Sequence, residues 1–137
     1  MTNSEDPKVY YALAEFHPIE GPIFDVIIPQ NAPIDVNLEF EIASSALYVS
    51  GLAKFFIEEN KIISFSFDVV NKNFQRKKRR FAFVVIIKKY NRNIIDIENT
   101  IEALLENAAK KTIQVLERDY FNSDYEHLKD IIRMHFR

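Results

Sequence analysis

The residues with the clearest chemical potential form a run of five consecutive cations in the second half of the chain. They are Arg76, Lys77, Lys78, Arg79 and Arg80. Such side chains bind phosphate groups, so the run is compatible with a contact to a GTPase or with an anionic membrane, where each cation contributes about 1 kcal/mol. It is also compatible with a solvated loop that discourages edge-to-edge strand pairing. Nucleic acid is not expected, because the net charge is −2 and Phe74 and Phe81 are too few aromatics for a stacking platform.

A second candidate is the pair Glu15 and His17, which strand alternation places on one face. The other histidines, His127 and His135, lie on a predicted late helix, and there is no cysteine. A metal or catalytic site therefore lacks a third ligand or a nucleophile at a defined spacing, so we expect a structural role at a hairpin corner. Glu15 and the acidic pair Glu58-Glu59 have no partner in view and are expected to be solvated.

The motifs of common nucleotide-binding and hydrolytic sites do not occur, and two glycines cannot build a phosphate-cradling loop. We therefore expect no cofactor, no metal and no nucleotide bound by this chain alone. The 137 residues, 47% hydrophobic and 28% charged, suit one globular domain. The polar, acidic residues 1–7 are expected to be disordered, and residues 8–137 to form a single domain. With no apolar run of eighteen residues, the protein is expected to be cytoplasmic, with the basic run as its means of peripheral membrane contact.

Hydrophobic alternation predicts a hairpin near the N-terminus. Its strands run from about Lys8 to Phe16 and from Ile23 to Ile28. Gly21 is expected to occupy a corner position that disfavours residues with a Cβ. Apolar groups on both faces of the first strand predict that it lies inside a sheet. A helix comes next, between Pro33 and Ser50, with Asp35 as its N-cap.

Three more strands are predicted after Gly51, which is expected to stop the helix. They are Leu52 to Ile57, Ile62 to Val70 and Phe81 to Ile87. The first of these could instead extend the helix. The second is expected to have one buried face and one polar face, with Ser64, Ser66 and Asp68 on the polar side. The third is apolar throughout, which is typical of a central strand covered on both sides.

Two helices are predicted to end the chain. One spans about Asp96 to Arg118 with Asp96 as its N-cap, and the other comes after a capping box that begins at Ser123 and continues to His135. The predicted order is strand, strand, helix, three strands, helix, helix. This order indicates an α+β fold with a five-stranded antiparallel sheet and helices.

The hairpin resembles a signature of one family. It is carried by the run Ala14-Glu15-Phe16-His17-Pro18-Ile19-Glu20-Gly21-Pro22. The run is similar to the pattern E-F-H-P-x-x-G-P in the longin domain of nitrogen permease regulator 2-like proteins, relatives of folliculin and the DENN proteins. The resemblance covers about residues 9–90 and implies a longin-like, profilin-like sheet. Those proteins continue beyond their longin domain, and the sequence here has no counterpart of that continuation.

The resemblance extends to the loop that begins the basic run. Asn73-Phe74-Gln75-Arg76, with Phe81 five positions after the arginine, is similar to a family loop of form K-Y-S-R with an aromatic residue five positions on. In that family the loop carries an arginine finger that stimulates GTP hydrolysis on a Rag-type GTPase. The resemblance implies that Arg76 is that arginine.

These observations lead to three functional hypotheses. The main one is a non-catalytic adaptor that binds a Rag-like or Arf-like small GTPase and pairs with itself or with a longin or roadblock protein. The others are a GTPase-activating protein that uses Arg76, and a peripheral membrane scaffold that uses the basic run. The first helix has apolar residues around much of its circumference, so Phe40, Leu47 and Tyr48 are expected to contact a partner, together with Lys77 to Arg80.

Overall fold

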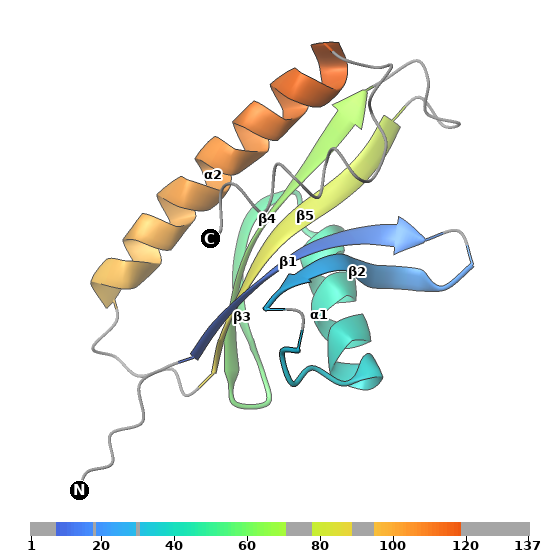
Figure 1. Ribbon diagram of the computed structural model, residues 1–137. Coiled ribbons are helices and arrows are strands. Elements are labelled where there is room, and N and C mark those ends of the chain that lie inside the picture. Colours follow the sequence, from blue (N-terminus) through green and yellow to red (C-terminus); the bar gives the residue numbers. More distant parts are fainter. Residues whose placement is uncertain (1–7, 18, 30, 71–77, 89–94, 119–137) are drawn as a thin grey trace, which may run out of the picture.

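Residues 8–17, 19–29, 31–70, 78–88 and 95–118 are described by a computed structural model. They form five strands and two helices (Figure 1). In chain order these are β1 (Lys8–His17), β2 (Gly21–Ile28), α1 (Val36–Tyr48), β3 (Gly51–Ile57), β4 (Asn60–Val70), β5 (Lys78–Lys88) and α2 (Ile95–Arg118). The α+β class is confirmed, and the order agrees with the predicted one as far as α2. The predicted last helix, from Ser123 to His135, and the segment 1–7 lie outside the described residues.

The strands form one antiparallel sheet in the order β2-β1-β5-β4-β3. The strand β5 is therefore central, and its residues from Phe81 to Ile87 are all buried, as predicted. The strand β1 lies between β2 and β5, which confirms that it is interior. The segment Leu52 to Ile57 is part of β3, an edge strand, and does not extend the helix.

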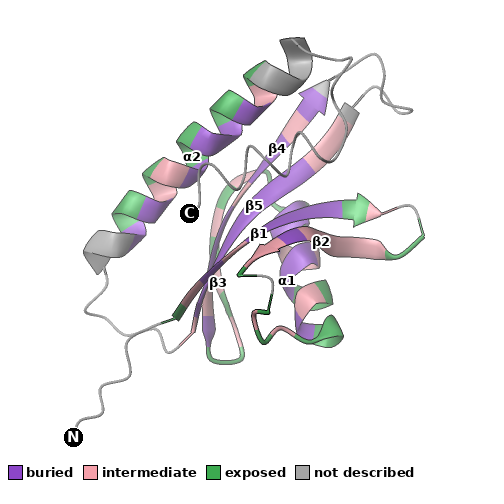
Figure 2. Cartoon of the chain, in the orientation of Figure 1, coloured by how far each residue is buried: buried purple, intermediate pink, exposed green. Residues whose placement is uncertain are grey.

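The two helices pack on opposite faces of the sheet, and Figure 2 shows buried residues concentrated on the central strands and on the inner sides of the helices. Alternate residues of β5 belong to two apolar clusters. Phe81, Phe83, Val85 and Ile87 pack with α2, whereas Ala82, Val84 and Ile86 pack with α1. The described helices include none that is long and apolar enough to cross a membrane.

The prediction that one face of β4 is polar rather than buried is wrong. Ser64 and Ser66 are buried, because α1 covers this side of the sheet. The Ser66 hydroxyl donates a hydrogen bond to the carbonyl oxygen of Val49 and accepts one from the main-chain N–H of Gly51 at 3.1 Å. Serine on this face therefore links β4 to the connection between α1 and β3, a role that the alternation pattern alone cannot distinguish from solvation.

The ends of the elements agree with the predicted signals in part. Asp35 caps α1, since its carboxylate accepts a hydrogen bond from the Leu38 N–H at 2.8 Å. Gly21 has φ +78°, as expected for the hairpin corner. Gly51 was expected to stop the helix, but α1 ends at Tyr48, and Gly51 starts β3 with φ +81°. The helix α2 begins at Ile95, one residue before the predicted cap position Asp96.

Replacing Gly51 by alanine is expected to lower the free energy of unfolding by about 1–2 kcal/mol, because a side chain disfavours positive φ. An added Cβ would meet no atom within 4 Å, so the cost is conformational rather than steric. Gly51→Asn is the matched variant and should lose less, since asparagine tolerates positive φ better. Urea unfolding of the three proteins measures the difference, and equal stability of the alanine variant and the parent would contradict the prediction.

Candidate functional site

The basic run does not form one loop. The hairpin of β4 and β5 continues as far as the pair Val70 and Lys78, so Lys78, Arg79 and Arg80 belong to β5. This corrects the expectation of a solvated loop for these three residues. Arg76 and Lys77 lie outside the described residues. Because side chains alternate along a strand, Arg79 and Arg80 lie on opposite faces of the sheet.

Arg80 joins the sheet to the end of α1. Its guanidinium binds both carboxylate oxygens of Asp68, with Nε–Oδ1 at 3.0 Å and Nη2–Oδ2 at 3.3 Å. It also donates to the carbonyl oxygen of Leu47 at 3.1 Å and to the Ser50 hydroxyl at 2.9 Å. A cation at a helix C-terminus satisfies carbonyl groups that have no partner within the helix. The hydrogen bond with Asp68 raises the pKa of Arg80.

Arg79 makes a different ion pair on the face that α2 covers. It donates to Glu15, which is buried in β1, and its guanidinium carbon lies 5.1 Å from the centre of the Phe81 ring. Glu15 was expected to be solvated, and this expectation is wrong. The cause is the β1–β5 register, which sets Glu15 opposite Phe81. Arg79 lies two positions before Phe81 on the same face of β5, and it is therefore a neighbour of Glu15.

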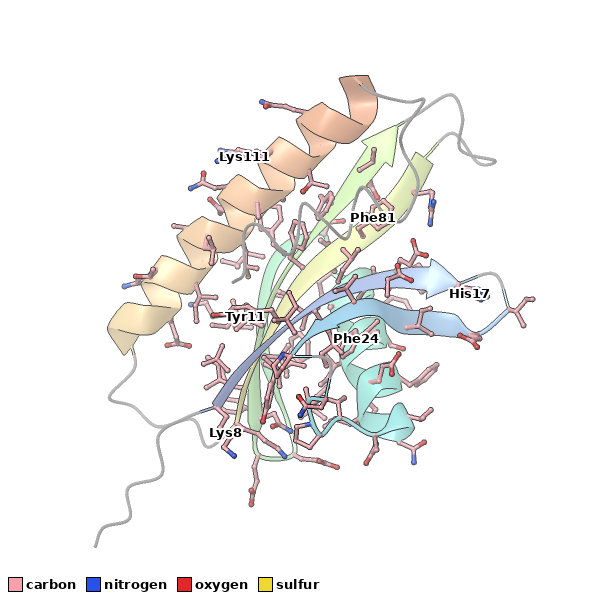
Figure 3. All side chains as sticks on the ribbon, viewed as in Figure 1. Lys8, Tyr11, His17, Phe24, Phe81 and Lys111 are labelled. Atoms are coloured by element: carbon pink, nitrogen blue, oxygen red, sulfur yellow. The ribbon has the colours of Figure 1, made fainter. Side chains whose placement is uncertain are left out.

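Glu15 and His17, the candidate pair, therefore have different roles. The Nδ1 atom of His17 accepts hydrogen bonds from the N–H groups of Ile19 and Glu20, both at 3.1 Å. Figure 3 shows His17 near the tip of the β1–β2 hairpin. The predicted structural role at the corner is confirmed. Among the described residues, no three potential ligands of the His, Cys, Asp and Glu types gather as a metal site.

Of the three apolar residues of α1 that were predicted to contact a partner, two are exposed. Phe40 is 52% exposed and Tyr48 is 81% exposed. Their spacing of eight residues separates them by about 12 Å along the helix axis and by about 80° around it. Leu47 is only 1% exposed and packs in the core between α1 and the sheet, so its assignment to a surface is wrong. Leu47 belongs to the buried stripe of α1 that packs on the sheet, together with Leu38, Ile42, Ala43 and Ala46. We call the exposed residues Phe40, Tyr48 and Val49 the helix patch.

A second exposed apolar site was missed by the sequence. On the edge strand β3, Leu52 is 36% exposed and Phe56 is 58% exposed, with Lys54 between them on the same face. Side chains of this strand alternate between the two faces of the sheet, but both faces carry apolar residues, so the sequence does not indicate which face is exposed. Only the place of β3 at the sheet edge reveals which phase lacks cover.

No protein-family model matches this chain, and no curated protein matches it. The resemblance to the longin domain therefore depends on the hairpin and loop residues, with an architecture that is compatible with it: a five-stranded antiparallel sheet between two helices.

Removal of Arg79 is expected to destabilise the fold by about 2 kcal/mol, because it leaves the buried Glu15 carboxylate without its paired cation. The double variant Glu15→Gln with Arg79→Ala should be more stable than Arg79→Ala alone, since a neutral amide is less costly to bury. Chemical unfolding of the parent, both single variants and the double variant gives the coupling energy. Additive effects of the two substitutions would show that the pair is not coupled.

Proposed function

We propose that this protein is a non-catalytic adaptor of the longin class that binds a small GTPase, Rag-like or Arf-like, and assembles with itself or with a longin or roadblock protein. The observation that carries the proposal is the helix patch. Phe40 and Tyr48 are large aromatic side chains of α1 that are mostly exposed and contribute little to the core. Aromatic residues of this kind dominate the binding energy of protein interfaces.

The helix patch is held on a rigid support, which favours binding. Asp35 caps the start of α1, and Arg80 binds the carbonyl oxygen of Leu47 at its end. Between them, Glu39 accepts a hydrogen bond from the Phe24 N–H of β2 at 2.8 Å. Because the helix is tied to the sheet along its length, binding a partner costs little conformational entropy.

The second candidate is a GTPase-activating protein with Arg76 as its arginine finger. Its support is the resemblance of the loop, together with the pairing of Val70 and Lys78, which brings both ends of the segment 71–77 to one point of the sheet. A positioned guanidinium stabilises the charge that develops on the transferred phosphoryl group, and this accelerates hydrolysis by about 10³–10⁵. The neighbouring Arg79 and Arg80 are engaged with Glu15 and Asp68, so they are not alternatives for this role.

The adaptor proposal predicts that the double variant Phe40→Ser, Tyr48→Ser lowers GTPase affinity at least about tenfold, because it removes aromatic contacts of hot-spot size. The control is Ile19→Ser, which removes an apolar residue that is 89% exposed at the hairpin tip. Affinity is measured by calorimetry with Rag-like and Arf-like GTPases in both nucleotide states. Unchanged affinity in the double variant, or an equal loss in the control, would exclude the helix patch.

The activator hypothesis predicts that the protein accelerates single-turnover GTP hydrolysis and that Arg76→Ala abolishes the acceleration while Lys78→Ala does not. Binding without acceleration would leave the adaptor and exclude the finger. Binding to anionic vesicles that falls by similar steps when Arg76, Lys77 and Lys78 are each neutralised, and that weakens with salt, would instead support the membrane scaffold. In that case Arg79 and Arg80 should contribute least, because carboxylates already neutralise them.

A further inference from the structure

The ring of His17 closes the corner between β1 and β2 (Figure 3). His17 is the last residue of β1 and pairs with Gly21, the first residue of β2. Its Nδ1 atom accepts hydrogen bonds from the N–H groups of Ile19 and Glu20, which follow it by two and three positions. Asparagine and aspartate make the same pattern with a side-chain oxygen in an Asx turn. The histidine therefore acts as a turn residue, but through an atom that can also bind a proton.

The hydrogen bonds of the corner require the neutral form of the ring. An Nδ1 atom that accepts hydrogen bonds is unprotonated, so the single proton of the neutral ring is on Nε2. In the imidazolium both ring nitrogens are donors. A proton on Nδ1 would point at the N–H groups of Ile19 and Glu20, and both hydrogen bonds would be lost. Protonation of His17 and the closed corner therefore exclude each other.

The charged groups around the ring do not reverse this preference. Among the described residues these are Glu15 of β1, Glu20 of the turn and Arg79 of β5, whereas the facing residues of β2, Gly21 to Ile23, are uncharged. Glu15 is already paired with Arg79, so only the exposed Glu20 favours a cation. An exposed ion pair contributes at most a factor of about five to an equilibrium constant, and each hydrogen bond contributes about the same factor. Two lost bonds therefore outweigh one gained ion pair.

We propose that His17 is an acid-sensitive latch: a proton on its ring opens the corner between β1 and β2 and releases the N–H groups of Ile19 and Glu20. Histidine is the side chain whose charge ordinarily changes between about pH 5 and pH 8. The latch is therefore closed in neutral solution and opens in mild acid.

The latch controls an apolar surface at the tip of the hairpin. Ile19 is 89% exposed and Phe16 is 47% exposed, and both lie within two positions of His17. While the corner is closed, the hydrogen bond to the Ile19 N–H holds the main chain that carries this side chain. An open corner has more conformations, so a partner that binds the tip has to order it first. Acid should therefore weaken contacts made through the tip, a role separate from the proposed function, which uses α1.

The sign of the pH dependence of stability tests the latch. The closed corner excludes a proton that His17 accepts in the unfolded chain, so the parent should lose stability relative to His17→Asn as the pH falls from about 8 to about 5. His17→Asn is the matched variant, because its amide oxygen can accept the same hydrogen bonds and does not titrate.

Urea unfolding of both proteins across this pH range measures the difference. The folding equilibrium constant of the parent should fall at least about fivefold more than that of His17→Asn, the factor expected for one lost hydrogen bond. A difference that stays constant with pH would overturn the inference. So would a parent that gains stability in acid relative to the variant, because the carboxylates would then outweigh the hydrogen bonds.

NMR spectroscopy locates the effect in the chain. The ratio of intrinsic to observed amide exchange rates at Ile19 and Glu20 should fall at least about tenfold in acid, with the midpoint at which the His17 ring titrates. In His17→Asn these amides should keep their protection. The other two histidines, His127 and His135, are distinguished by substituting each in turn.

Two NMR results would contradict the latch. If the His17 ring titrates while both amides keep their protection, the corner stays closed around a charged ring. If protection is lost equally in His17→Asn, or is retained in acid by Glu20→Gln, the acid response belongs to the Glu20 carboxylate instead.

Discussion

The ion pair of Arg80 with Asp68 is the polar contact that joins α1 to the strands it packs on. One guanidinium bridges the β4–β5 hairpin, the last turn of α1 and the start of the connection to β3. Asp68 belongs to β4 and Leu47 to α1, and Ser50 lies between α1 and β3, so the contact adds a polar link to the apolar packing of α1 on the sheet. Arg79, one residue earlier and on the opposite face, ties β5 to β1 through Glu15. The beginning of β5 therefore fastens the central strands to the elements on both sides.

This arrangement changes how the basic run should be interpreted. As a sequence it is five equivalent cations, but as a structure it contains two guanidinium groups that are already matched with carboxylates. Their Coulombic attraction for a distant phosphate surface is correspondingly reduced, because each ion pair is nearly neutral at a distance. The number of cations in the run therefore overstates its attraction for a phosphate surface.

The two apolar surfaces of the molecule also have different physical origins. The helix patch exists because α1 has apolar residues around more of its circumference than the sheet can cover. The exposed residues of β3 have another cause. This strand is the last one of the sheet, and α2 packs mainly on β4 and leaves part of β3 uncovered. The two surfaces lie on different faces of the sheet, since Leu52 and Phe56 share the face of α2. The helix patch and the exposed residues of β3 are therefore separate surfaces.

The sequence by itself determined the elements and the class of the fold. Strand alternation, the apolar run of β5, the Asp35 cap and the corner glycine Gly21 are local signals, and each predicted the correct element because local backbone preferences and the apolar pattern agree there. The tertiary structure decided what those elements face. In the folded structure Leu47 and Ser66 are buried and Glu15 pairs with Arg79. Leu52 and Phe56 are exposed at the sheet edge. These outcomes depend on the strand order and on which face of the sheet each helix covers. Both are set by contacts between residues distant in the chain, and such contacts produce no periodic pattern in the sequence.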